Sequence, residues 1–210
     1  MKCKKCHNEF NQINTLQRYC YRCALEKAKE LTKKKEDKAW RKRKIEMKEK
    51  IKTVSDYRNE LQKFINKIAR LIDYGCPCIS CGIKAKKENG CHFKSVGANP
   101  SLRYNLLNIY LGCNRCNVEL GGNVHGYDDG IINLFGVDFW EYLKFGMIRD
   151  FPILSLSVSE IKEKIVICKD IIRELESDLI KIGNPDRIKK RIELNDRIGI
   201  YENKCYIYSY

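Results

Sequence analysis

Hydrophobic and polar positions divide the chain into a polar first quarter and a remainder with clear apolar periodicity. Residues 24–53 are rich in helix-forming side chains and contain neither Gly nor Pro, which predicts a long exposed helix. A second helix is predicted from Ser55, as its N-cap, to Gly75. Its apolar residues recur at i, i+3, i+4 and i+7 and form a stripe that should pack on a core: Leu61, Phe64, Ile65, Ile68, Leu71 and Ile72.

The C-terminal half repeats the helical pattern. Residues 131–147 predict a helix that covers the preceding turn-rich segment through Phe139, Trp140 and Leu143. Residues 157–183 have an N-cap serine, strong 3.6-residue periodicity and a terminal glycine, and residues 185–199 begin with a proline near the first helical turn. The aromatic tail, residues 201–210, is predicted to be a strap on the core or disordered. Together these patterns predict a mainly helical α+β protein.

The twelve cysteines change this picture, because no export signal precedes them and they are therefore expected to stay reduced and to bind metal. Eight of them form Cys-x-x-Cys pairs, and two such pairs complete a tetrahedral zinc site. We predict two structural Zn²⁺ sites, one from Cys3, Cys6, Cys20 and Cys23 and one from Cys78, Cys81, Cys113 and Cys116. His7 is an alternative ligand in the first site. No role is assigned to the remaining thiols, which are Cys76, Cys91, Cys168 and Cys205.

The formal net charge of +14 favours a polyanionic partner. Residues 1–53 contain 18 basic and 7 acidic residues. The alternative of a solvated helix with paired charges does not account for so one-sided an excess, which favours phosphate contact. The predicted DNA-contacting residues are Lys33, Lys34, Lys35, Arg41, Lys42, Arg43, Lys44, Lys94, Arg103 and Arg115. Neither an apolar run of about 18 residues nor an apolar signal core occurs, so we expect a cytoplasmic protein with no membrane partner.

Residues 78–117 combine paired cysteines with other side chains of catalytic potential. The order is Cys78-x-x-Cys81, His92, Asn108, and then Cys113-x-x-Cys116 followed directly by Asn117. This order resembles the zinc-stapled HNH nucleases, whose ββα-metal fold consists of a short β-hairpin and a helix. A plain zinc ribbon is the alternative, but it would not require His92, Asn108 and Asn117.

A closer resemblance extends over most of residues 1–127. The segments "PCISCG" (77–82), "CHFKS" (91–95), "PSLRYNLLNIYLGCNRCN" (100–117) and "GGN" (121–123) resemble the NinG family, also called Rap, of lambdoid phage recombination proteins. The N-terminal paired cysteines and the lysine-rich helix also fit that family. The resemblance implies a structure-selective endonuclease that cuts branched recombination intermediates such as Holliday junctions and D-loops. It further implies a bacterial host cytoplasm and phage recombination proteins as partners.

Similarity to HNH enzymes implies a role for each of three residues. His92 would act as the general base, Asn108 would orient its ring, and Asn117 would help to bind one catalytic Mg²⁺ or Mn²⁺. Many HNH enzymes have a metal-binding Asp before the histidine, whereas this chain has Cys91, a poor ligand for a hard cation. The substitute candidates are Glu119, His125 and Asp128. If none of them serves, the alternative is a non-catalytic, zinc-dependent nucleic-acid-binding recombination accessory protein.

The sequence predicts four successive regions. They are an N-terminal four-cysteine zinc module (1–23), a basic helical arm (24–53), an HNH-like zinc-stapled nuclease core with its preceding and covering helices (54–150), and a C-terminal helical region (151–210). Resolving a four-way junction takes two cuts, which favours a homodimer.

Overall fold

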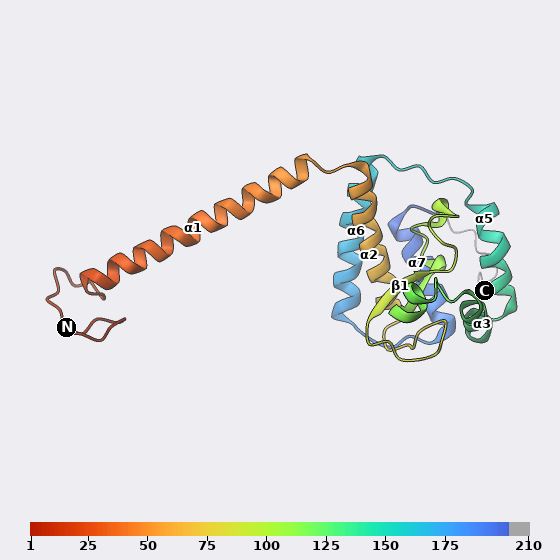
Figure 1. Ribbon diagram of the computed structural model, residues 1–210, viewed down its shortest axis with the longest axis horizontal. Coiled ribbons are helices and arrows are strands. Elements are labelled where there is room, and N and C mark those ends of the chain that lie inside the picture. The colour runs from red at the N-terminus through yellow and green to blue at the C-terminus, as the bar shows by residue number, and fades with distance from the viewer. Residues whose placement is uncertain (202–210) are drawn as a thin grey trace. The chain divides into compact units, whose positions relative to one another are not determined.

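A computed structural model describes residues 1–201 and divides the chain into two compact units, one ending at Lys52 and the other beginning at Thr53 (Figure 1). The first unit contains a small knuckle, closed by an isolated bridge between Lys2 and Glu9, and the helix α1, Tyr21–Lys50. Cys23 is the buried residue of α1, and the other side chains of the helix lie largely in solvent. The prediction of a long exposed helix is therefore confirmed.

The second unit is mostly helical and contains one two-stranded sheet. Its elements are α2 (Val54–Ile72), β1 (Glu88–His92), η1 (Pro100–Leu102), η2 (Leu106–Asn108), β2 (Ile109–Cys113), η3 (Arg115–Glu119), α3 (Val124–Phe135), α4 (Val137–Glu141), η4 (Tyr142–Gly146), α5 (Met147–Asp150), α6 (Val158–Ser177) and α7 (Asn184–Ile198). Helices α2 and α6 lie side by side (Figure 1). Among residues 1–201, no helix combines the length and the apolar character needed to cross a membrane.

The N-cap of helix α2 lies two residues before the predicted one. Thr53, not Ser55, caps the helix, because its hydroxyl accepts from the backbone N–H of Asp56 while the Asp56 carboxylate accepts from the backbone N–H of Thr53. This reciprocal capping box satisfies two N–H groups, whereas a cap at Ser55 would forgo it. The predicted stripe is confirmed, since Leu61, Ile65, Ile68 and Ile72 are buried. Each such side chain contributes about 1.5–3 kcal/mol on burial.

The β1–β2 hairpin lies between α2 and α3. Its antiparallel register pairs Cys91 with Tyr110 and His92 with Ile109. On one face Gly90 allows close approach of α2, because a Cβ there would come within 2.8 Å of the Cβ of Asn66. On the other face the Tyr127 hydroxyl of α3 donates to the Cys91 carbonyl at 2.7 Å.

The covering helix predicted at 131–147 is a series of shorter elements that begins earlier, at Val124. The chain turns at Gly136, whose φ of 90° is readily adopted by glycine, and this ends α3. The predicted contacts of Phe139 and Leu143 with the core are confirmed, since both are fully buried, while Trp140 is half-buried.

Helix α6 begins at the predicted N-cap, Ser157, which forms a capping box with Glu160. The helix ends at Ser177 and not at Gly183. Two residues with low helix propensity, Ser177 and Asp178, stand at the end, and Asp178 leaves the helical conformation. Helix α7 has Pro185 in its first turn, as predicted, and ends at Ile198. The next residue, Gly199, has a left-handed backbone.

A buried polar network fastens α7 to the core. The Asp73 carboxylate contacts Arg187 and Arg191, each at 2.7 Å, and accepts from the backbone N–H of Leu111 at 2.8 Å. Arg191 also donates to the carbonyls of Leu106 and Ile109. Removing one partner would leave an uncompensated buried charge, which typically costs about 3–5 kcal/mol.

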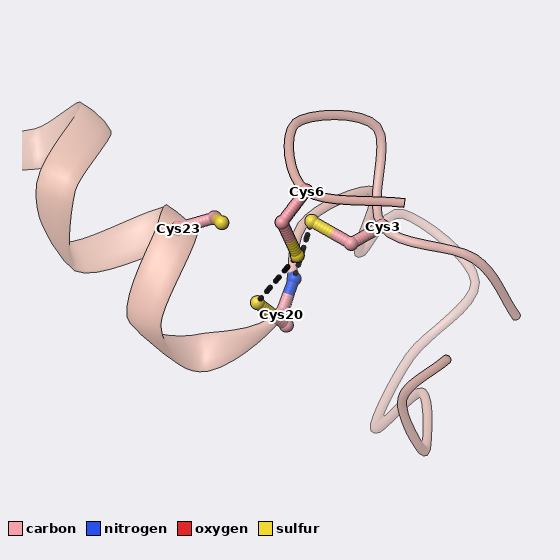
Figure 2. A group of neighbouring side chains, drawn as sticks. All are labelled: Cys3, Cys6, Cys20 and Cys23. Atoms are coloured by element: carbon pink, nitrogen blue, oxygen red, sulfur yellow. Dashed lines mark hydrogen bonds between the residues drawn. The ribbon is translucent and has the colours of Figure 1, made fainter. Parts of the chain in front are cut away.

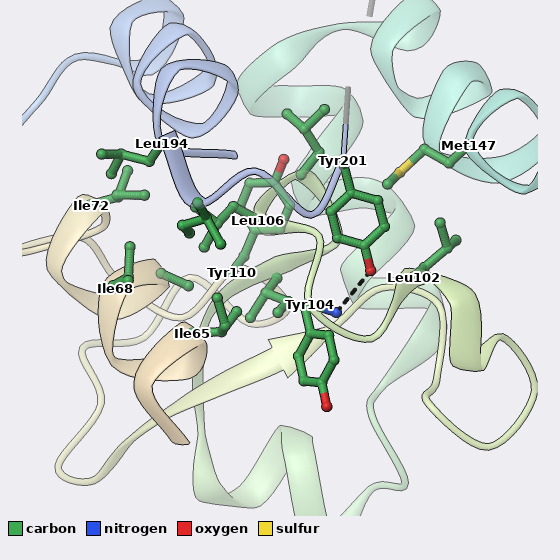
Figure 3. Close-up of a cluster of buried hydrophobic side chains, with 14 of the residues drawn as sticks. Ile65, Ile68, Ile72, Leu102, Tyr104, Leu106, Tyr110, Met147, Leu194 and Tyr201 are labelled. Atoms are coloured by element: carbon green, nitrogen blue, oxygen red, sulfur yellow. Dashed lines mark hydrogen bonds between the residues drawn. The ribbon is translucent and has the colours of Figure 1, made fainter. Parts of the chain in front are cut away.

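Tyr201 extends this attachment beyond α7. Its hydroxyl donates to the Ser101 carbonyl at 2.7 Å and accepts from the backbone N–H of Tyr104 at 3.2 Å (Figure 3). At this residue the predicted strap on the core is present. The rest of the predicted tail, 202–210, and with it Cys205, lies outside the described residues.

Candidate metal centres and candidate active site

The first four-cysteine group joins the N-terminal knuckle to the first turn of α1 (Figure 2). The sulfur atoms of Cys3, Cys6, Cys20 and Cys23 lie within 4.8 Å of one another, and those of Cys6 and Cys20 are 3.8 Å apart. Four thiolates at about 2.3 Å from one zinc ion give sulfur–sulfur edges of about 3.8 Å. The backbone N–H of Cys20 donates to the Cys3 sulfur at 3.4 Å. The group therefore fits Zn²⁺, and the exposed His7 is not part of it.

The second group, Cys78, Cys81, Cys113 and Cys116, joins the loop after α2 to the end of β2 and to η3. The Cys81 and Cys113 sulfurs are 3.9 Å apart, and the backbone N–H of Cys116 donates to the Cys113 sulfur at 3.4 Å. The loop is held in place by the Ile79 N–H, which donates to the Leu111 carbonyl of β2 at 2.9 Å. The spacing of these four sulfur atoms also fits zinc. Four thiolates leave no coordination position for a reacting water.

Helix α3 approaches this second group closely because of two glycines. A Cβ at Gly126 would overlap the Ser80 carbonyl oxygen, and one at Gly130 would overlap the Ile79 carbonyl oxygen. Just before α3, the Asn123 amide donates to the Cys116 sulfur at 3.4 Å from a left-handed backbone with φ of 45°. Such a hydrogen bond would stabilise the negative charge of a zinc-bound thiolate.

His92 ends β1 and is half-buried. Its Nε2 lies 3.0 Å from the backbone carbonyl of Arg103, which can only accept, so Nε2 carries the proton. Nδ1 is then the basic nitrogen, and within residues 1–201 no hydrogen bond to it is found. Burial lowers the pKa of the imidazole, and the nearby positive charge of Arg103 lowers it further, while the carbonyl hydrogen bond acts in the opposite direction. His92 therefore has the tautomer and protonation state of a general base.

Asn108 is fully buried and bonds to backbone rather than to the imidazole. Its Oδ1 accepts from the Lys94 N–H at 2.7 Å, and its Nδ2 donates to the carbonyls of Lys94 and Leu102 at 3.0 and 3.2 Å. Its own carbonyl accepts from the Phe93 N–H at 2.8 Å. Asn108 thus holds the residues that follow β1 against the segment that supplies the Arg103 carbonyl.

Cys91 directly precedes His92, and its surroundings do not suit a ligand for a hard cation. The side chain is buried against Gly112, on the side of the hairpin where Cys78 lies. Burial raises the pKa of the Cys91 thiol to about 12. A neutral buried thiol does not bind Mg²⁺.

The candidate ligands for a catalytic cation do not converge. Asn117 is half-buried in η3, Glu119 is exposed and lies 3.5 Å from the Asn114 amide, and His125 is exposed. Both oxygens of Asp128 are engaged, by Trp140 Nε1 at 2.7 Å and by Lys144 Nζ at 3.0 Å. In the part of the chain that the structure describes, the groups of three or more His, Cys, Asp or Glu able to hold a metal are the two cysteine groups. The oxygen ligands present do not fit a Mg²⁺ or Mn²⁺ site.

The predicted DNA-contacting residues fall into two sets. Seven lie exposed along α1: Lys33, Lys34, Lys35, Arg41, Lys42, Arg43 and Lys44. The other three belong to the second unit, where Arg115 is exposed on η3 and Lys94 and Arg103 are half-buried next to the His92 hairpin. Trp40 and Ile45 of α1 are also exposed.

Sequence reasoning assigned no role to several residues that shape this region. The Arg103 carbonyl could not be found, because a backbone group has no sequence signal. Arg187 and Arg191, the partners of Asp73, did have a sequence signal, because they recur with Asn195 every four residues on the buried face of α7. Asn123 belongs to the quoted "GGN" segment, but its bond to Cys116 depends on a backbone conformation that asparagine adopts more readily than most residues.

Comparison with known proteins places the chain among phage proteins. The family model described as Bacteriophage Lambda NinG protein matches residues 1–178. "Protein ninG" of Escherichia phage 933W and that of Escherichia phage lambda are each 32% identical to the chain over 87 residues. "Protein ninG" of Salmonella phage P22 is 31% identical over 88 residues. Each match covers 41% of this chain and 43% of the relative. No solved structure matches the chain. Since the family model spans most of its length, the chain belongs to the NinG family of phage proteins.

Proposed function

We propose that this protein is an endonuclease with an HNH-like ββα core, acting on branched DNA such as Holliday junctions and D-loops. The observation that carries the proposal is the state of His92. A half-buried imidazole whose Nε2 proton is held by a carbonyl presents Nδ1 as a base at the end of a hairpin. Within residues 1–201 this Nδ1 accepts no hydrogen bond, so it is available to a water molecule. The substrate class follows from the family resemblance.

The order of elements supports the same proposal. The hairpin β1–β2 is followed by helix α3, and the second four-cysteine group joins the hairpin to the loop before it. In the proposed reaction His92 Nδ1 takes a proton from water as the water oxygen attacks phosphorus, the bond from phosphorus to the 3′ oxygen breaks, and the leaving 3′ oxygen takes up a proton from solvent. Asn108 is a positioning residue, because it hydrogen-bonds the backbone of residues 93–94, next to His92, and of Leu102, next to Arg103.

A second candidate function is a zinc-dependent nucleic-acid-binding accessory protein without catalysis. Two observations favour it. Cys91 is a buried thiol, and the Asp128 carboxylate is already paired with Lys144, so neither offers a free carboxylate to a catalytic cation. The two functions differ in one measurable respect. Both predict DNA binding, but cleavage is expected only of the endonuclease.

The test is a strand-nicking assay on a labelled four-way junction with zinc-loaded protein and added Mg²⁺ or Mn²⁺. We expect His92→Ala to retain two zinc ions, the folded state and junction binding, while cleavage falls about a hundredfold or more. A parallel loss of stability and binding would identify His92 as a packing residue instead. Wild-type protein that binds junctions and leaves every strand intact, with either cation, would establish the accessory function.

A further inference from the structure

A cavity of about 110 Å³ lies beside the residues that hold His92. It is bounded by the start of α2, by the segment around η1 and by residues 154–161. Most of its lining is apolar: Pro100, Tyr104, Leu154, Leu156 and Ile161. The charged residues that line it are Arg58 and Arg103, both positive. An apolar hollow with two guanidinium groups favours an anionic occupant, since arginine presents planar paired donors to phosphate oxygens.

The side chain of Arg103 is held by neutral hydrogen-bond partners, so its positive charge is not compensated. Its Nε donates to the Gln62 amide oxygen at 3.2 Å, and one terminal nitrogen donates to the Asn59 amide oxygen at 2.7 Å. Both partners are neutral, and within residues 1–201 no ion pair is found for Arg103 or Arg58. Three of the five guanidinium N–H donors of Arg103 therefore remain for a ligand. A structural arginine in a folded core more commonly faces a carboxylate, as Arg191 does with Asp73.

Arg58 is tied to the same cavity wall through its backbone. The Tyr104 hydroxyl donates to the Arg58 carbonyl at 3.2 Å, so this turn of α2 lies against the segment that carries Arg103. The Arg58 side chain itself is exposed and extends from that anchored backbone. Two positive side chains on two elements thus converge on one hollow.

The same residue also contacts His92. The Arg103 carbonyl holds the Nε2 proton, and the charge of the guanidinium is close enough to act on the imidazole. We propose that Arg103 and Arg58 form a phosphodiester-binding site for the nucleic-acid backbone beside His92. This inference deepens the proposed function and rests on it for the identity of the ligand.

The probe is a fluorescently labelled four-way DNA junction, bound by zinc-loaded protein in a buffer without Mg²⁺ or Mn²⁺ so that no cleavage is expected, with the salt concentration varied. Arg103→Gln keeps the backbone carbonyl and removes the charge. We expect its affinity to fall about tenfold and its salt dependence, as log K against log salt, to decrease by about 0.9. Arg58→Gln should act in the same direction, and Arg103→Lys should restore the salt slope but only part of the affinity, because lysine lacks the paired donors.

The matched control is Arg173→Gln. Arg173 is exposed, pairs with Asp170 and lies three turns of α6 away from Ile161, about 18 Å along the helix. If Arg103→Gln and the control give the same affinity and salt slope, the phosphodiester site is wrong. That outcome, with wild-type cleavage present, leaves the endonuclease proposal standing. A lower salt slope in Arg103→Gln without any wild-type cleavage upholds the phosphodiester site and removes the endonuclease proposal.

Discussion

The surroundings of the His92 imidazole act on its proton affinity in opposing directions. Burial lowers the pKa, because the imidazolium loses hydration, and the charge of Arg103 lowers it further. The Arg103 carbonyl favours the protonated Nε2 and therefore raises it. The net shift is downward from the usual value of about 6.5. Because a general base must be neutral, this environment extends the active form to more acidic pH.

The first prediction concerns the pH dependence of this residue. We expect cleavage to rise with pH along a limb whose midpoint lies below about 6.5, since deprotonation of His92 creates the base. The ring signals of His92 in a histidine NMR titration should show the same midpoint, and with three histidines in the chain they can be assigned by substitution. His7→Asn, in the separate N-terminal unit, serves as the control and should leave the profile unchanged. A midpoint at or above 6.5 would contradict this account.

At the scale of elements, close backbone approach decides how the second four-cysteine group is held. Helix α3 packs on the cysteine loop through Gly126 and Gly130, and α2 packs on β1 through Gly90. No side chain could occupy these positions without moving an element. The glycines thus set the distances among α2, the hairpin and α3, and through them the place of His92.

Gly130→Ala tests this packing. A Cβ there meets the backbone carbonyl of Ile79, which cannot move without disturbing Cys78 next to it. We expect the free energy of unfolding, measured with urea on zinc-loaded protein, to fall by about 1–3 kcal/mol. Gly97→Ala is the matched control, because a Cβ at Gly97 has no neighbour within 4 Å. Equal stabilities of the two variants would show that α3 and the cysteine loop adjust to each other freely.

Elements with a local signal could be predicted from sequence, and those that depend on tertiary contacts could not. The stripe of α2, the Ser157 cap and the Pro185 and Gly199 ends of α7 are local, and the structure has all of them. The break at Gly136 and the end of α6 at Ser177 were missed because apolar periodicity continues through both. At the candidate site, the spacing of the cysteines predicted two four-cysteine groups, and the structure brings the members of each group together. The hydrogen bonds of His92 and Asn108 depend on backbone groups distant in sequence, which no motif encodes.

At the scale of the whole molecule, the two four-cysteine groups belong to different compact units. The first has its ligands within residues 3–23, and the second within residues 78–116. The knuckle of the first unit buries little besides Cys3 and Cys23, so we expect its fold to depend on a bound metal. The second unit has an extensive apolar core in addition to its cysteine group. Loss of metal should therefore affect the two units differently.

Elemental analysis of purified protein is expected to give two zinc ions per chain. Cys3→Ser should reduce this to about one and leave the unfolding transition of the second unit unchanged. Cys78→Ser should also remove one ion, but it should destabilise the second unit and abolish cleavage, because the cysteine loop supports both β2 and α3. Folded protein that contains no metal would overturn the assignment of both sites.

The distribution of charge over the whole molecule predicts that α1 provides general DNA affinity, apart from the chemistry proposed for His92. Residues 1–53 have an excess of 11 positive charges, from 18 basic and 7 acidic residues, and those on α1 are exposed. Each phosphate contact releases about 0.9 counterions from duplex DNA. Replacing Arg41, Lys42, Arg43 and Lys44 with Gln should therefore lower the salt slope of junction binding by up to about 3.6 and weaken binding at every salt concentration.

The control replaces an equal number of exposed basic residues in α6, in α7 and between them, namely Lys169, Arg173, Lys181 and Lys189, with Gln. The net charge then changes by the same amount in both variants. If α1 contacts phosphates, its variant alone should show the lower salt slope, while cleavage at saturating DNA stays near the wild-type rate, because His92 and its supports lie in the other unit. Equal losses in both variants would mean that net charge, rather than α1 itself, attracts the DNA.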